Sequence, residues 1–133
     1  VQAVLGGIGA VSLFVAAIGI ANTMMMSIYE RTKEIGIMKV LGCSLGRIRD
    51  LFLLEAGFIG LSGGAIGLLL SYGISAVINA VAGNSTGYST LSYIPLWLSV
   101  VALIFAVIIG MLAGLMPALR AMKLSALSAL RNE

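Results

Sequence analysis

The stretch that decides the fold is residues 56–119, AGFIGLSGGAIGLLLSYGISAVINAVAGNSTGYSTLSYIPLWLSVVALIFAVIIGMLAGLMPAL. It contains no Asp, Glu, Lys or Arg over 64 residues. About 20 apolar residues cross a hydrocarbon core that is about 30 Å thick, so this stretch is too long for one crossing. The run from Gly83 to Gly87 has the composition of a turn, and Pro95 suits the start of a new helix. We therefore expect two membrane spans, at about 56–82 and 96–116.

The charged residues lie only in two windows on either side of this stretch. All 8 Lys and Arg and all 5 Asp and Glu fall within residues 30–55 or residues 120–133. Residues 1–29 are again uncharged, which predicts a further span at about 3–29. An ionised side chain at the centre of a membrane helix costs about 2.5–3.5 kcal/mol on insertion scales. The charge distribution therefore predicts an all-α integral membrane protein with three spans.

Composition supports this class and excludes others. The chain of 133 residues is 60% hydrophobic and 10% charged, whereas a soluble domain is usually about 25% charged. The net charge of +3 could suggest nucleic acid as a partner. However, the basic residues gather at membrane edges and form no stripe interleaved with aromatics, so we exclude a nucleic-acid partner.

The basic residues also predict the orientation. Lys and Arg are concentrated on the cytoplasmic side of membrane proteins, so we expect the loop 30–55 and the tail 118–133 in the cytoplasm. The N-terminus and the loop before Pro95 then lie outside, with Tyr88, Tyr93 and Trp97 at that interface. A chain that starts outside at Val1, within an apolar run, suggests an earlier span and an external domain upstream.

Reactive side chains are scarce. The chain has one cysteine, Cys43, and no histidine, so neither an internal disulfide nor a Cys/His metal cluster is expected. We interpret Cys43 as a reduced, small apolar residue. The spans carry no ionisable side chain other than tyrosine, which argues against a proton relay. Since no G-x-x-x-x-G-K-[ST] motif occurs, we expect no ATP hydrolysis by this segment itself.

Small residues recur at four-residue spacing in the spans. Overlapping G-x-x-x-G pairs occur in the second span and a further pair in the third; the positions are Gly60, Gly63, Gly64, Gly67, Gly110 and Gly114. Residues at this spacing share a helix face and let helix backbones approach closely. The pattern is compatible with a dimer or gating interface and also with ordinary packing inside the chain.

The window 29–44, YERTKEIGIMKVLGCS, carries the most specific pattern. Opposite charges at Glu30–Lys33 and Arg31–Glu34 favour continuation of the first helix beyond the membrane. Gly42 is suited to end that helix, and Ser44 to cap a second, imperfectly amphipathic helix at residues 45–55. Such a helix between two spans fits a cleft on a soluble partner, although composition alone also allows a solvated loop.

This window resembles the signature of FtsX-like permeases, the MacB/LolC/LolE group of ABC transporters. The family pattern is E-R-x-x-E-I-G-[IVL]-x-[KR]-[AV]-x-G-[AC], which residues 30–43 match, and I-x-x-x-F-L-x-E-A, which residues 48–56 match. The family's tail, P-A-x-x-A-x-[KR]-L-x-P-x-x-A-L-R-x-E, is similar to residues 117–133. The chain departs from it at Ser125 and Ala126, where the family usually has Asp and Pro.

The resemblance implies the last three of four membrane helices of a permease in a bacterial inner membrane. It implies a cytoplasmic coupling helix within residues 30–55 that docks on an ABC ATPase. The residues expected at that site are Glu30, Arg31, Lys33, Glu34, Ile35, Gly36, Lys39, Gly42, Ser44 and Arg47. Catalytic, cofactor and metal residues are not expected here, because ATP and Mg²⁺ would bind the ATPase.

The same resemblance implies further partners and a function. A second permease copy or homologue is expected, and an extracytoplasmic adaptor is compatible with it. ATP-driven motion would pass to the membrane helices and to an external domain, for export or mechanical work on peptide, lipoprotein, drug or cell-wall hydrolase partners. One alternative is a non-transporting adaptor or sensor that binds a different cytosolic partner through residues 30–55. Another is a small self-assembling membrane protein such as a holin.

Overall fold

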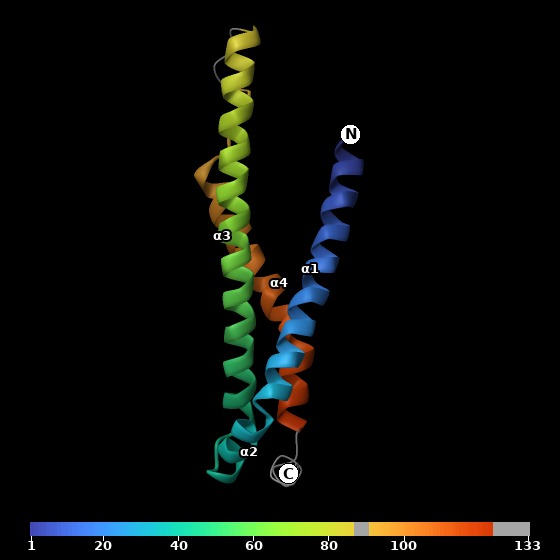
Figure 1. Ribbon diagram of the computed structural model, residues 1–133, viewed down its shortest axis with the longest axis vertical. Helices are drawn as coiled ribbons and strands as arrows, with labels where there is room; N and C mark the ends of the chain where they lie inside the picture. The colour runs from blue at the N-terminus through green and yellow to red at the C-terminus, as the bar shows by residue number, and fades with distance from the viewer. Residues whose placement is uncertain (87–90, 124–133) are drawn as a thin grey trace.

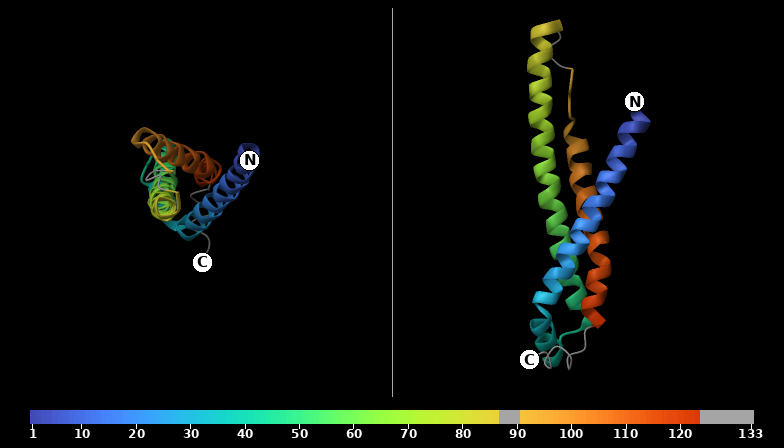
Figure 2. Two further views of the ribbon diagram at one scale, coloured as in Figure 1. Left: turned by 90° about the horizontal axis from the view of Figure 1, so that it is seen from above. Right: turned by 45° about the vertical axis from the view of Figure 1, so that its right-hand side comes forward.

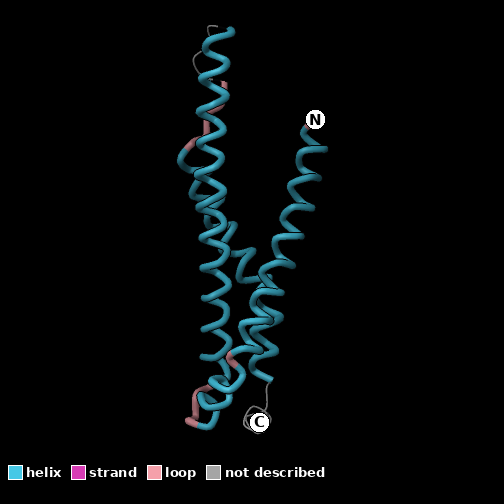
Figure 3. Tube along the Cα trace, viewed as in Figure 1, coloured by secondary structure: helices cyan, strands magenta, loops and turns pink. Residues whose placement is uncertain are grey.

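The computed structural model describes residues 1–86 and 91–123, and this part of the chain is all-helical (Figures 1 and 3). Its helices are α1 (Gln2–Glu30), α2 (Thr32–Val40), α3 (Leu45–Thr86) and α4 (Leu96–Lys123). Helices α1, α3 and α4 are long and apolar enough to cross a membrane, which confirms the predicted all-α class with three candidate membrane-spanning helices. Tyr88, Ser125, Ala126 and most of the tail lie outside the described residues.

The three long helices form an open V (Figures 1 and 2). Helix α4 runs antiparallel to α3 and packs against it, with Gly114 beside Ala56 at one end of the contact and Ser99 beside Tyr72 at the other. Helix α1 joins this pair at the end that carries the charged residues and leans away from α3 toward its N-terminus. Every residue from Val1 to Ser12 is exposed, so the first half of α1 is free to contact lipid or another helix.

The buried core lies at the closed end of the V. It brings together residues from all four helices: Met24, Ile28, Ile35, Ile48, Phe52, Ala56, Ala118 and Ala121. Burying a large apolar side chain in a core is worth about 1.5–3 kcal/mol. The charged segment is therefore not a loose loop, because it folds around an apolar centre made with the ends of the spans.

The connection between the first span and α2 is a break in the helix rather than the continuation that we expected. Helix α1 ends at Glu30, Arg31 takes φ −99° and ψ 14°, and α2 begins at Thr32. The expected Arg31–Glu34 pair is replaced by an ion pair between Arg31 and Glu55 of α3, at 3.8 Å. The break turns α2 so that Ile35 enters the core.

Helix α2 ends at Val40, and Gly42 reverses the chain two residues later, in the role predicted for it. This glycine has φ +84°, a left-handed conformation that costs other residues energy. The Gly42 N–H donates to the Lys39 carbonyl at 3.1 Å, and the Cys43 N–H donates to the Met38 carbonyl at 2.9 Å. These two bonds form a Schellman motif. Cys43 and Met38 both pack against the core, which fixes the reversal of the chain.

The predicted short helix at residues 45–55 is not a separate element. It is the first part of α3, which continues without interruption from Leu45 to Thr86 over 42 residues. The Ser44 carbonyl accepts from the Arg47 N–H at 3.0 Å, which places Ser44 at the N-cap. Residues 45–56 contain no proline to interrupt the helix, and Phe52 and Ala56 carry one buried face across the expected boundary.

Helix α4 also extends beyond its predicted end at Met116. It runs through Pro117 to Lys123, although proline removes an intrahelical hydrogen bond. Pro117, Ala118 and Ala121 are buried, so tertiary packing holds the helix together past the proline. The expected tail from residue 118 therefore begins as helix, and residues 124–133 are not described.

Candidate functional site

Helices α3 and α4 approach each other closely at a set of small residues. A Cβ atom added to Gly110 would lie 2.7 Å from the Ala56 carbonyl oxygen, and one added to Gly64 would lie 2.8 Å from the Ala106 Cβ. A Cβ on Gly60 would collide with the Ala106 carbonyl oxygen. These glycines, with Gly114, therefore lie in the contact between the two helices of this chain.

Gly63 and Gly67 occupy a different position. Nothing lies within 4 Å of an added Cβ at either residue. Gly63 lines an apolar hollow between α1 and the α3–α4 pair, which also includes Leu13, Ile20 and Ile109. Of the two overlapping glycine motifs of the second span, the 60/64 pair is in close contact with α4 and the 63/67 pair is not.

A polar cluster joins the far end of α3 to the segment before α4. Asn79 Oδ1 accepts from the backbone N–H groups of Leu91 at 2.9 Å and Ser92 at 2.8 Å, while Asn79 Nδ2 donates to the Ser92 carbonyl at 2.8 Å. Ser75 Oγ lies 2.8 Å from Ser92 Oγ. The Asn79 side chain therefore forms hydrogen bonds with backbone groups of Leu91 and Ser92, as a neighbouring β-strand would.

One further bond continues this cluster toward the membrane interior. Tyr72 Oη and Ser99 Oγ are 2.7 Å apart, so α3 and α4 are linked by side chains beyond their glycine contact. Asn79 is a polar residue within the apolar run of the second span. Its partners could not be foreseen, because they lie in an irregular segment.

Several of the predicted coupling residues face the interior of the chain. Ile35 is fully buried and Gly36 is buried beside it, so they seat α2 on the core. Lys39 Nζ donates to the Met122 carbonyl of α4 at 2.7 Å. The last carbonyls of a helix lack intrahelical partners, and Lys39 supplies one from another helix. Burial lowers the pKa of Lys39 below its ordinary value.

The remaining predicted residues are exposed, on α2 itself and on the chain to either side of it. Glu30, Lys33, Glu34, Ser44 and Arg47 are exposed. Three apolar side chains lie among them: Ile37, Val40 and Leu41, with exposed fractions of 45%, 64% and 80%. We call Lys33, Glu34, Ile37, Val40 and Leu41 the α2 outer face. The sequence pattern included Ile37 and Val40 in the signature without indicating that they point outward.

The α2 outer face is unusual in its position. Exposed apolar side chains on α1, α3 and α4 are expected where lipid covers them, but α2 is the helix with Lys33, Glu34 and Lys39 and lies at the charged end of the molecule (Figure 1). Apolar groups gathered at a polar end indicate an interaction surface. Neighbouring charges of both signs add the potential for directional ion pairs.

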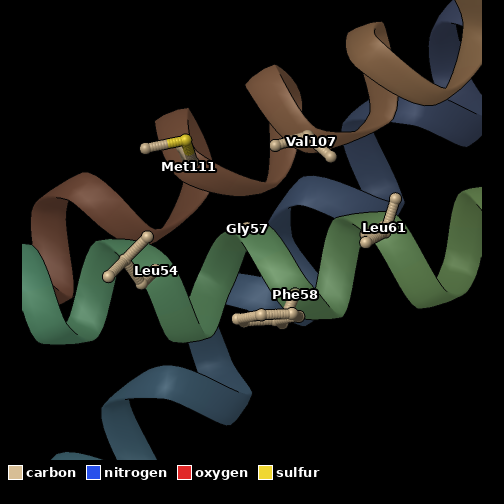
Figure 4. A pocket seen from close by; sticks show the side chains of 6 residues that line it. All are labelled: Leu54, Gly57, Phe58, Leu61, Val107 and Met111. Atoms are coloured by element: carbon tan, nitrogen blue, oxygen red, sulfur yellow. The ribbon is translucent and has the colours of Figure 1, made fainter.

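A second hollow lies on the outside of the α3–α4 pair (Figure 4). It is lined by Leu54, Gly57, Phe58, Leu61, Val107 and Met111. Its lining offers side chains without charge or hydrogen-bonding groups, so it suits an acyl chain or an apolar helix. Within residues 1–86 and 91–123, no three His, Cys, Asp or Glu side chains gather where a metal ion could bind.

Three apolar helices that are long enough to cross a membrane and converge on a charged end are the architecture of an integral membrane protein. Residues 6–126 match the family model of the FtsX-like permease C-terminal region. The chain belongs to this family of ABC transporter permeases.

Individual relatives agree with the family match. The chain is 40% identical over 136 residues to the ABC transporter permease YtrF of Bacillus subtilis, covering 95% of this chain and 31% of that protein. It is 44% identical over 128 residues to an uncharacterised ABC transporter permease of Methanocaldococcus jannaschii, covering 96% of this chain and 32% of that protein.

A third relative combines two functions in one protein. The chain is 40% identical over 128 residues to the macrolide export ATP-binding/permease protein MacB of Acinetobacter baylyi, covering 95% of this chain and 18% of that protein. The chain thus spans about a third or less of the length of the curated relatives it matches.

Proposed function

We propose that this chain is the part of an ABC transporter permease that receives force from a cytosolic ATPase and passes it to the membrane helices. Its α2 outer face would dock on the ATPase, in the cytoplasm, with the N-terminus of α1 on the opposite side of a bacterial inner membrane. ATP and Mg²⁺ would be bound by the ATPase, and a second permease copy or homologue would complete the transporter.

One observation carries the proposal: Leu41, Val40 and Ile37 are exposed at the charged end of the molecule. A lipid bilayer does not cover that end if the charged residues mark its edge, and water is a poor environment for a cluster of aliphatic side chains. A protein partner that contributes an apolar cleft with charged margins fits this surface best. Family membership makes an ABC ATPase the natural candidate.

The contacts of α2 with the other helices explain how a displacement caused by the ATPase could reach the membrane helices. The buried side of α2 inserts Ile35 into a core shared with α1, α3 and α4. Lys39 binds the end of α4, and Arg31 binds Glu55 of α3. A displacement of α2 would therefore move the ends of all three spans, because packed cores shift as units. The movement would then reach an external domain for export or mechanical work on a peptide, lipoprotein or drug.

The test uses the complete protein purified from its own membranes with its associated proteins. Leu41→Glu places a charge on the most exposed apolar residue of the α2 outer face and should abolish recovery of a P-loop ATPase. Leu41→Met keeps an apolar side chain of similar volume and should retain it. Because Leu41 is 80% exposed, neither change disturbs the core.

Three outcomes would contradict the proposal. Recovery of the same ATPase with Leu41→Glu would show that the α2 outer face is not the docking surface. Recovery of a partner other than an ATPase, lost with Leu41→Glu and kept with Leu41→Met, would support a membrane adaptor instead. ATPase activity stimulated equally by both variants would also exclude coupling through this surface.

A further inference from the structure

The C-terminal half of α4 has two faces of different character. One face is small and buried, and its residues are Gly110, Gly114, Pro117, Ala118 and Ala121. The other face carries two rows at four-residue spacing: Leu112, Met116 and Arg120 form one, and Leu115, Leu119 and Lys123 form the other. Residues four apart lie one above another on a helix. Each row of apolar side chains therefore ends in a cation.

The rows are exposed and border a shared hollow. The exposed fractions are 61% for Leu112 and 66% for Met116, and Leu115 and Leu119 are exposed to a smaller degree. All six residues of the two rows line a hollow of about 470 Å³ along this face of α4. Its apolar part lies on the membrane-spanning helix, and its cations lie where the uncharged stretch ends.

The charges around the two cations favour an anion. Between Ala56 and Lys123 the sequence contains no Asp or Glu. The acidic residues that precede this stretch pair with other cations: Glu55 with Arg31, and Asp50 with Arg49 at 2.7 Å. The acidic residue that follows it, Glu133, lies outside the described residues. The structure records no ion pair for Arg120 or Lys123 with another described residue. Lys39 adds positive charge at the Met122 carbonyl.

This positive charge must outweigh one opposing effect. The C-terminal end of a helix carries a partial negative charge, which repels anions. Lys39 occupies the Met122 carbonyl at that end, while Arg120 and Lys123 present two full positive charges one helical turn apart. The balance remains in favour of an anionic group.

We propose that this face of α4 binds one anionic phospholipid. Its phosphate lies between Arg120 and Lys123, one acyl chain follows Leu112 and Met116, and the other follows Leu115 and Leu119. A zwitterionic lipid binds more weakly, because the two basic side chains repel the cation of its headgroup. The hollow of Figure 4 lacks any cation and so provides an internal comparison within the same pair of helices.

The test measures lipid retention by the purified and delipidated complete protein. Phosphatidylglycerol or phosphatidylcholine is added back, and bound lipid is counted by native mass spectrometry. The wild type should prefer phosphatidylglycerol. The double variant Arg120→Gln with Lys123→Gln should lose about thirtyfold in phosphatidylglycerol affinity, because each basic side chain near an anionic lipid contributes about fivefold.

The matched control is Lys33→Gln with Arg47→Gln, which removes two exposed cations from the same end of the molecule. It should keep the phosphatidylglycerol preference. Equal loss in both double variants would overturn the site, because it would show a general effect of charge. Unchanged affinity in the Arg120 and Lys123 double variant would overturn it as well.

A second measurement locates the bound lipid. Phosphatidylglycerol with a photoreactive group in its acyl chain should cross-link to peptides that contain Leu112 to Leu119. Cross-links confined to Leu54, Phe58 and Leu61 would place the lipid in the hollow of Figure 4 and refute the assignment. Arg120→Lys, which keeps the charge, should restore cross-linking lost in Arg120→Gln.

Discussion

At the residue scale, two glycines of one helix show how position decides the role of a residue. Gly60 faces the backbone of α4, whereas Gly63 faces a space with no atom within 4 Å of an added Cβ. Both belong to G-x-x-x-G motifs, and the sequence treats them alike. Three residues advance a helix by about 300°, so Gly63 is turned about 60° from Gly60, toward the hollow that faces α1.

We expect Gly60→Ala to destabilise the protein and Gly63→Ala to leave its stability nearly unchanged. The new methyl group at residue 60 collides with a backbone carbonyl, which cannot rotate away as a side chain would. Overpacking of this kind costs about 1–3 kcal/mol. Thermal unfolding in detergent, followed by the fluorescence of Trp97, the one tryptophan of this chain, would measure the melting temperatures of the two variants. Equal melting temperatures for the two variants would contradict the assigned contact.

Lys39 predicts a pH dependence of stability at the charged end. Its pKa is lowered in the folded protein by burial, so between the folded and unfolded pKa values the unfolded state holds more protons. Stability then rises with pH in that alkaline range and is independent of Lys39 titration near neutrality. We expect the melting temperature of the wild type, measured relative to Lys39→Met, to increase from pH 8 toward pH 10.

The control for this prediction is Lys33→Met, at an exposed position on the same helix. The difference in melting temperature between the wild type and Lys33→Met should not change with pH in the way expected for Lys39→Met. If the wild type became less stable relative to Lys39→Met as the pH rises through the alkaline range, the burial of Lys39 against the end of α4 would be contradicted.

At the scale of elements, the three membrane spans could be predicted from the sequence, because the absence of charge extends over long stretches. The junctions between the helices could not be predicted in this way. Charged side chains are costly in hydrocarbon, so the three spans appear in the sequence as uncharged stretches. The positive φ at Gly42 could be expected because the residue is a glycine. The break at Arg31 and the continuity of α3 depend on which side chains reach the core. Ile35, Phe52 and Ala56 are buried together in this core through contacts between different helices. Local sequence does not specify such contacts.

The same reasoning applies to the predicted coupling residues. Their location at the charged end followed from the motif, but their direction did not. Lys39 and Glu34 are both charged residues of one short helix, yet Lys39 reaches α4 and Glu34 faces outward. The break at Arg31 sets the rotation of α2 and therefore decides which residues can meet a partner.

Asn79 supports a prediction about the junction between α3 and α4. Asn79→Leu keeps the size of the side chain and removes three hydrogen bonds to Leu91 and Ser92. Each bond contributes about 0.5–1.5 kcal/mol, so hydrogen exchange of those two amides should become at least about tenfold faster. Ser71→Ala is the control, since Ser71 bonds the Gly67 carbonyl of its own helix. Unchanged exchange would contradict the role of Asn79.

At the scale of the whole molecule, the V shape predicts unequal mobility. Helices α3 and α4 are held by glycine contacts and by the Asn79 cluster, whereas α1 joins them only at the closed end (Figure 2). Spin labels at residues 5 and 69 should therefore give a broad distance distribution, and labels at residues 69 and 101 a narrow one. The labels replace Leu5, Leu69 and Val101, all exposed, in a protein with Cys43→Ala.

The same labels test the proposed function in the assembled transporter. Trapping the ATPase with ATP and vanadate should change the 5–69 distance and leave the 69–101 distance unchanged. A change confined to the 69–101 pair would show that α3 and α4 separate instead. Two narrow and invariant distributions would exclude α1 as the moving element.

The length of α3 has a mechanical consequence. At a rise of about 1.5 Å per residue, its 42 residues extend about 63 Å, roughly twice the thickness of the hydrocarbon core. A tilt of about 10° around the closed end would swing the far end by about 11 Å. The helix therefore has the proportions of a lever arm: a displacement of ångström size near the fulcrum would become one of nearly a nanometre where α3 meets Leu91 and Ser92.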